Sequence, residues 1–198
     1  MHILNNPHIW QFFRGLLEIF FGHYRKRIST IRSFGITDQM TVLDVGCGIG
    51  QYAILTKKKY LGIDMDKKYI NLAKQTYKNN SLKKFLCEDL GKAKLSDAAF
   101  DVSLLVDFTH HLSNEELNHV FVELNRITSK YIVISDPVKQ SDKNLIGRFL
   151  TYIDRGNYIR AENHLINLIG NYFRLLEVKK VRSMGIESVS VLACPKEI

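Results

Sequence analysis

The feature that most constrains the fold is a repeated alternation of strand-like and helix-like segments between residues 41 and 136. Runs rich in β-branched and aliphatic residues are typical of buried parallel strands, and they lie at 41–45, 60–64, 85–88, 100–106 and 131–135. Helix-like stretches lie between them, at 51–58, 66–79 and 114–129. Because parallel strands need crossover connections, this order predicts an open, doubly wound α/β sheet.

The C-terminal third departs from this alternation. Residues 142–153 and 161–173 have helical patterns, and two strand-like runs follow at 176–182 and 188–194. The short connection through Met184 and Gly185 allows only an antiparallel hairpin between these runs. The complete prediction is a Rossmann-like sheet of seven strands, mostly parallel, with a C-terminal antiparallel hairpin.

A length of 198 residues suits one domain with a sizeable core. We divide the expected domain 1–198 into four parts by their patterns. An N-terminal helical cap covers 1–37 and includes apolar residues at helical spacing over 8–34; a cofactor-binding core covers 38–136; a lid-like insertion covers 137–175; a closing hairpin covers 176–198.

Composition excludes several classes of protein. No apolar run is long enough to span a membrane, and the N-terminus lacks the layout of a secretory signal, so we expect a cytoplasmic protein. The three cysteines, Cys47, Cys87 and Cys194, are isolated from one another, which predicts neither a disulfide framework nor a metal site. The net charge of +8 is spread along the chain and is typical of solvated lysines.

A glycine-rich loop directly follows the first predicted strand. Its glycines, Gly46, Gly48 and Gly50, would let a ligand approach the backbone at the carboxyl edge of the sheet. Gln51 stands where a dinucleotide fingerprint has its third glycine. Asp44, two residues before the loop, would repel a pyrophosphate but would suit the ammonium group of a methionine moiety. The loop therefore favours S-adenosylmethionine over a dinucleotide.

Two further carboxylates follow later strands in the same order. Asp64 ends the second predicted strand, where it can accept hydrogen bonds from both ribose hydroxyls. Asp89 follows the third and could accept from the adenine amino group, with Met65 and Leu90 beside the ring. Asp89 could instead cap a turn.

At this point the chain resembles the class I S-adenosylmethionine-dependent methyltransferases. The resemblance covers residues 38–136 and rests on LDVGCGIG, GID, CEDL and FDVSLLVDFTHHL. It implies S-adenosylmethionine as cofactor and S-adenosylhomocysteine as product. By this resemblance the backbone at Val106 contacts the methionine part, and a helix before the loop closes over the methionine carboxylate. Tyr24 and Arg27 are the candidate partners of this carboxylate; a core aromatic and a solvated arginine are the alternatives for them. The expected cofactor-binding set is Asp44, Gly46, Cys47, Gly48, Gly50, Asp64, Met65, Asp89, Leu90, Val106, Tyr24 and Arg27, although Cys47 could simply be a small residue that fits the turn.

The candidate catalytic residues follow the fourth predicted strand. By the resemblance Asp107 faces the methyl-transfer region, and His110 or His111 could act as a general base. We prefer His111 of the two; packing at a helix start is the alternative for both histidines.

The insertion after residue 137 commonly forms the acceptor lid in this family. Its arginines, Arg155 and Arg160, could hold an anionic acceptor or could form salt bridges that fix the lid. We expect methyl transfer to a small-molecule acceptor, with oxygen as the accepting atom, no metal and no stable nucleic-acid partner; the oligomeric state stays open. RNA or protein methylation, noncatalytic cofactor binding, and membrane-surface binding by the N-terminal aromatic residues are the alternatives.

Overall fold

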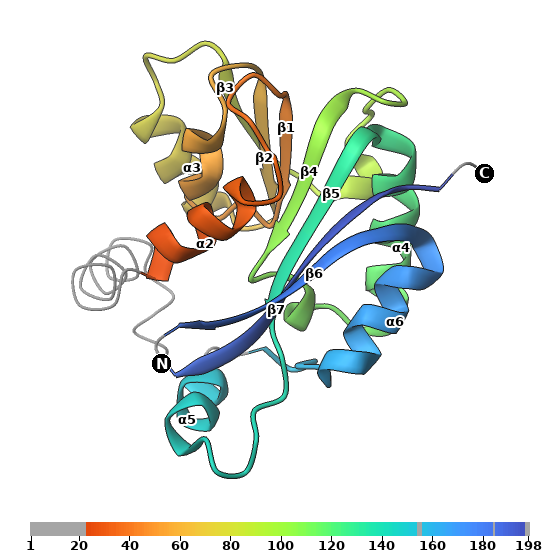
Figure 1. Ribbon diagram of the computed structural model, residues 1–198. Helices are drawn as coiled ribbons and strands as arrows, with labels where there is room; N and C mark the ends of the chain where they lie inside the picture. The colour runs from red at the N-terminus through yellow and green to blue at the C-terminus, as the bar shows by residue number, and fades with distance from the viewer. Residues whose placement is uncertain (1–22, 154–155, 184, 197–198) are drawn as a thin grey trace.

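The computed structural model describes residues 23–153, 156–183 and 185–196 (Figure 1). It contains one seven-stranded sheet in the order β3-β2-β1-β4-β5-β7-β6. The first five strands pair in parallel, and β7 runs antiparallel to both β5 and β6, as the sequence predicts. The strands are β1 (Val42–Val45), β2 (Tyr60–Asp64), β3 (Lys83–Cys87), β4 (Phe100–Val106), β5 (Thr128–Pro137), β6 (Phe173–Ser183) and β7 (Ile186–Pro195).

Helices cover both faces of the sheet (Figure 1). On one face lie α2 (His23–Arg32) and α3 (Lys67–Thr76), and on the other lie α4 (Asn114–Ile127) and α6 (Glu162–Tyr172). Two of these helices begin at caps that are visible in the sequence. Asp66 accepts a hydrogen bond from the Lys68 amide at the start of α3, and Ser113 and Glu116 form a capping box at the start of α4.

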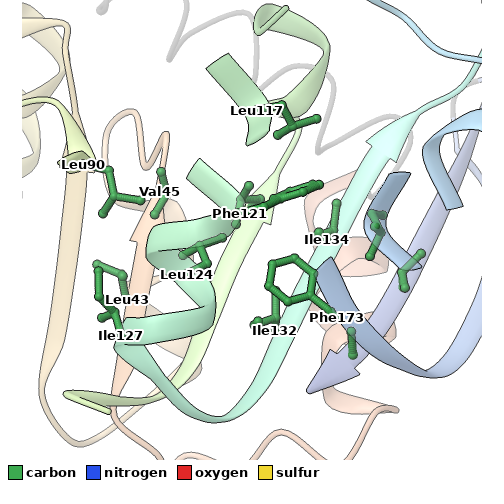
Figure 2. Close-up of a cluster of buried hydrophobic side chains, with 14 of the residues drawn as sticks. Leu43, Val45, Leu90, Leu117, Phe121, Leu124, Ile127, Ile132, Ile134 and Phe173 are labelled. Carbon is green, nitrogen blue, oxygen red and sulfur yellow. The ribbon is translucent and has the colours of Figure 1, made fainter. Parts of the chain in front are cut away.

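The larger hydrophobic cluster lies between the sheet and the α4–α6 face (Figure 2). Phe121 of α4 and Phe173 of β6 are both fully buried, and their rings meet edge to face at 5.1 Å. Burying one such side chain stabilises the fold by roughly 1.5–3 kcal/mol. Leu43, Leu124 and Ile132 belong to the same cluster. This packing explains the apolar runs of the predicted strands.

The structure corrects several predicted boundaries. Residues 51–58 do not form a full helix; only a short 3-10 helix, η2 (Gln51–Leu55), is present, because the chain turns extended at Thr56. Helix α5 (Leu145–Ile153) begins three residues later than predicted, since the Asn144 side chain accepts from the Gly147 amide and caps it. The predicted helix over 8–34 is seen as α2, and its earlier residues lie outside the described ones.

The carboxyl ends of the five parallel strands meet at one edge of the sheet. This edge collects the loops that follow β1, β2, β3, β4 and β5, as expected for an open α/β fold. The turn between β6 and β7 lies at the same edge, because Pro137 at the end of β5 pairs with Ser188 near the start of β7. Among the described residues, no helix has the length and apolar character needed to cross a membrane.

Candidate active site

The glycine loop turns sharply away from the end of β1. Gly46, Gly48 and Gly50 all have positive φ angles, of 74°, 52° and 77°. The amides of Gly46 and Cys47 both donate to the Ile63 carbonyl, at 2.8 and 3.1 Å, which ties the loop to β2. A Cβ atom at Gly46 would lie 2.1 Å from the Phe108 ring, whereas one at Gly48 would meet nothing within 4 Å. The loop is therefore packed on one side and open beside Gly48.

Asp64 fixes the open part of the loop. One carboxylate oxygen accepts from the Gly48 amide and the other from the Asp66 amide, both at 2.8 Å. The side chain is half-buried, and each oxygen has a second lone pair for a further donor. Asp64 is thus held in place at the loop while it can still accept from a ligand hydroxyl.

Asp44 lies beneath the loop with only 1% of its surface exposed. It accepts a hydrogen bond from the Tyr60 hydroxyl at 2.5 Å. The pKa of Asp44 is raised to about 7, mainly by burial; the Tyr60 hydrogen bond lowers it, and the nearby charge of Asp64 adds to the rise. A buried carboxylate with this pKa favours a neighbouring cation. The sequence predicts Asp44 as a residue of the site but gives no indication that Tyr60 is its hydrogen-bond partner.

Other predicted cofactor residues occupy different environments around the loop. Cys47 is buried beneath it, and burial raises the pKa of its thiol, so the thiol stays protonated. Met65 is 76% exposed, whereas Leu90 is buried. Asp89 is exposed and accepts from the Gly91 amide at 2.9 Å, which is the turn-capping contact that the sequence offered as its alternative role.

Helix α2 is joined to the site by Tyr24 and Arg27. The Tyr24 hydroxyl donates to the Gln51 carbonyl in the segment after the glycine loop. The Arg27 guanidinium is 2% exposed and pairs with the Asp107 carboxylate. It also donates to the hydroxyls of Ser135, at 2.6 Å, and Ser188, at 3.2 Å. Arg27, predicted as a cofactor ligand, therefore links α2 to the ends of β4, β5 and β7 in this structure.

The segment after β4 carries the predicted catalytic residues. Val106 is buried at the end of the strand, and Asp107 follows with a φ of +52°, its amide donating to the Ser135 carbonyl at 2.8 Å. This residue turns the chain into the 3-10 helix η4 (Thr109–His111). His111 is exposed, and its ring lies 4.1 Å from the ring of the buried His110.

A buried carboxylate that sequence reasoning missed holds this segment. Asp136, at the end of β5, is fully buried and accepts from the Thr109 hydroxyl, from the His110 Nδ1 and, at 3.2 Å, from the His110 amide. Its position at the end of a parallel strand, like those of Asp44 and Asp64, was the available signal. Asp136 fixes the His110 ring, and its carboxylate engages the Nδ1 proton.

The insertion after β5 folds back over η4. The Tyr158 amide donates to the His110 carbonyl at 3.0 Å, and a Cβ on Gly156 would lie 2.1 Å from the His110 ring. Residues 156–160 therefore pack directly over His110, and we call them the cover segment.

Arg160 anchors the cover segment. Its five N–H groups make five hydrogen bonds, with acceptors in the carbonyls of Thr109, Leu112 and Tyr158 and in the side chain of Asn114. A guanidinium has five donors, so none remains for an acceptor molecule. In this structure Arg160 therefore fixes the lid, which is the alternative role that the sequence offered, and its contact with a substrate stays a prediction. Arg155, the other predicted substrate ligand, lies outside the described residues.

Comparison with known proteins gives consistent results. A methyltransferase-domain family model matches residues 43–131. A crystal structure of a protein from Pyrococcus horikoshii OT3 is 23% identical, with a TM-score of 0.70, covering 87% of this chain and 91% of that one. A S-adenosylmethionine-dependent methyltransferase from Aquifex aeolicus is 23% identical, with a TM-score of 0.64, covering 83% and 87%.

A third similar structure contains a reaction product. Magnesium protoporphyrin IX methyltransferase from Synechocystis PCC 6803, solved with bound S-adenosylhomocysteine, is 16% identical with a TM-score of 0.67, covering 87% of this chain and 82% of that one. No curated protein matches the sequence significantly. These structures share the fold, and the family model covers the part of the site from the glycine loop to η4.

Proposed function

Since the chain is a class I S-adenosylmethionine-dependent methyltransferase, we propose that it methylates an oxygen atom of a small-molecule acceptor. The observation that supports a small acceptor is the cover segment, which Arg160 holds over the residues after β4. A large macromolecular substrate would have to displace this segment. S-adenosylmethionine is the methyl donor and S-adenosylhomocysteine the product.

The residues of the first three strand ends fit this cofactor by their chemistry. The buried Asp44 carboxylate suits the methionine ammonium group, since a cation offsets the cost of burying its charge. The Asp64 carboxylate suits the ribose hydroxyls, and the open side of Gly48 allows close approach to the backbone. We assign Val106, Met65, Leu90 and Asp89 to the walls around the cofactor, with Asp89 accepting from the adenine amino group.

The cofactor supplies an activated methyl group on a positively charged sulfur. Transfer is an in-line displacement, so the protein contributes mainly by holding donor and acceptor in line. We assign His111 as the base that takes the acceptor hydroxyl proton, because it is exposed on η4, four residues after Asp107, and its ring lies against that of His110. His110 is buried and its Nδ1 proton is held by Asp136, so we assign it a positioning role for η4. We keep Arg155 as the proposed contact of an anionic acceptor.

Incubation of the enzyme with S-adenosylmethionine and a metabolite panel tests the proposal. The expected result is one metabolite that gains the mass of one methyl group on an oxygen, with S-adenosylhomocysteine formed in equal amount. Incubation with total RNA or a protein extract in the same assay addresses the alternative acceptors. Methylation of RNA or protein, with no metabolite modified, would show that the acceptor is not a small molecule.

A further inference from the structure

Helix α5 presents its apolar side to solvent. The fully buried residues on the side that faces the protein are small or polar, namely Asn144, Gly147 and Thr151, and Leu150 is half-buried. The side chains that face outward are large and apolar: Leu145, Ile146, Phe149 and Tyr152 are 72%, 68%, 63% and 84% exposed. A surface helix of a globular protein normally has the opposite arrangement. We call these four residues the α5 apolar face.

Polar contacts fix the direction of this face. The Asn144 side-chain amide donates to the Gly185 carbonyl at 2.7 Å, and Gln140 donates to the Glu187 carbonyl at 2.9 Å. Both acceptors belong to the region of the β6–β7 turn, so the helix is fastened to the sheet by its polar side. Rotating α5 to bury the apolar face would break these hydrogen bonds, and the aliphatic side chains of that face have no polar groups that could replace them. The exposure is therefore a consequence of the fold.

Cationic side chains surround the α5 apolar face. Lys139, Lys143 and Arg148 are exposed on or beside the helix, and the one acidic residue between 139 and 153 is Asp142, which lies 3.5 Å from Arg148. The β6–β7 hairpin adds the exposed Arg182, whose carbonyl accepts from Lys26 of α2. A row of aromatic and aliphatic side chains bordered by lysine and arginine matches the chemistry of an anionic phospholipid surface.

We propose that the α5 apolar face docks on an anionic lipid surface, with Phe149 and Tyr152 inserted at the headgroup level and the basic residues paired with lipid phosphates. A second copy of the chain fits less well, because the same basic residues would face each other across the contact. The docked helix lies at the carboxyl edge of the sheet, so the edge that carries the active site would face the lipid.

Sedimentation with lipid vesicles tests this proposal on the full chain. Vesicles of phosphatidylcholine alone are compared with vesicles that contain phosphatidylglycerol. We expect binding to the anionic vesicles that weakens as salt is added. The double variant Phe149→Ser, Tyr152→Ser should bind about 30-fold more weakly, since it removes two apolar side chains that the lipid would bury.

The control is the double variant Ile54→Ser, Val122→Ser, which removes exposed apolar side chains far from α5, 65% and 53% exposed. It should bind vesicles like the wild type. Equal vesicle binding by both double variants would overturn the proposal. A wild-type dimer in sedimentation equilibrium that only the α5 variant dissociates would also overturn it, because a second copy would then cover the face. The same holds if the α5 variant, without vesicles, changes the fluorescence of Trp10, the only tryptophan, because residues 1–22 would then cover the face.

Discussion

The carboxyl edge of the sheet has two halves that are built differently. In the cofactor half, around β1 and β2, the polar contacts join residues close in sequence: Asp64 holds Gly48, and Tyr60 holds Asp44, each 16 positions apart. In the acceptor half, around β4 and β5, they join distant residues: Arg27 binds Asp107 across 80 positions and Arg160 binds Thr109 across 51.

The two halves also differ in what their polar groups can still do. Asp64 is half-buried and keeps lone pairs for a ligand. Arg160 and Asp136 are buried, and their hydrogen-bonding groups are engaged within the protein. From this contrast we infer that the cofactor half is a binding surface supported by its own loop. In most of the acceptor half, by contrast, the polar groups bind one another within the protein, and His111 is exposed. Substitutions in the two halves should therefore change different measurements.

The largest effect is expected at His111. With the acceptor found by the metabolite panel, His111→Ala should lower kcat about 1000-fold, in the range that general-base catalysis contributes. The Kd for S-adenosylhomocysteine should stay within about twofold, because the imidazole acts on the acceptor. His119→Ala, an exposed histidine on α4, is the control. A His111→Ala kcat within a factor of three of wild type would remove His111 as the base.

The next largest effect is expected in the cofactor half. Asp64→Ala should raise the Kd for S-adenosylhomocysteine about 100-fold, since two hydrogen bonds to a charged acceptor are lost. Isothermal titration calorimetry measures this change. The matched variant is Asp66→Ala, which removes the α3 cap and should cost about 1 kcal/mol of stability with little change in Kd. Similar Kd values for both variants would contradict the ribose-binding role.

In the acceptor half, Arg160→Met should act on stability. The free energy of unfolding should fall by about 3 kcal/mol, because the buried carbonyl of Thr109 and the partly buried carbonyl of Leu112 lose their donor. The Kd for S-adenosylhomocysteine should change less than threefold. Arg126→Met breaks ion pairs that are partly exposed and should cost at most about 1 kcal/mol by urea denaturation. If Arg160→Met weakened cofactor binding and left stability unchanged, the division into two halves would fail.

The smallest effect is a pH dependence that should belong to the cofactor half alone. Below about pH 7, Asp44 takes up a proton and loses its attraction for the ligand ammonium group, so the affinity for S-adenosylhomocysteine should fall by at most about tenfold per pH unit. Titration calorimetry from about pH 6 to 8 measures this slope. Asp44→Asn should flatten it, and an unchanged slope in this variant would exclude Asp44 as the titrating group.

The same raised pKa of Asp44 also predicts how the stability of the protein changes with pH, in the direction opposite to that of cofactor binding. The folded protein holds the Asp44 proton more tightly than the unfolded chain, whose carboxyl has a pKa near 3.8. Stability from this group is therefore fully present at low pH and declines as the pH rises from about 4 to 7. In urea denaturation, Asp44→Asn should decline less than wild type across this interval. An equal decline in both proteins would place the proton uptake elsewhere.

Much of the fold could be predicted because its signals are local. The capping box of Ser113 and Glu116 spans one helical turn, and the strand runs reflect burial on both faces of the sheet. The predicted helix over 51–58 is wrong for a local reason as well, since η2 ends where the chain becomes extended at Thr56. The function of Arg160 could not be predicted, because an arginine in a lid-like insertion is compatible with a substrate contact or a structural one until its acceptors are known.

By itself the sequence determined the order of strands and helices, the glycine loop and the carboxylates within β1 and at the end of β2, because backbone conformation and side-chain period are properties of neighbouring residues. Only the tertiary structure decided that Asp136 holds His110, that Arg27 meets Asp107, and that α5 turns its apolar side outward. Those outcomes depend on which distant segments the sheet brings together, and the free energy of a buried polar group depends on the partner it finds there.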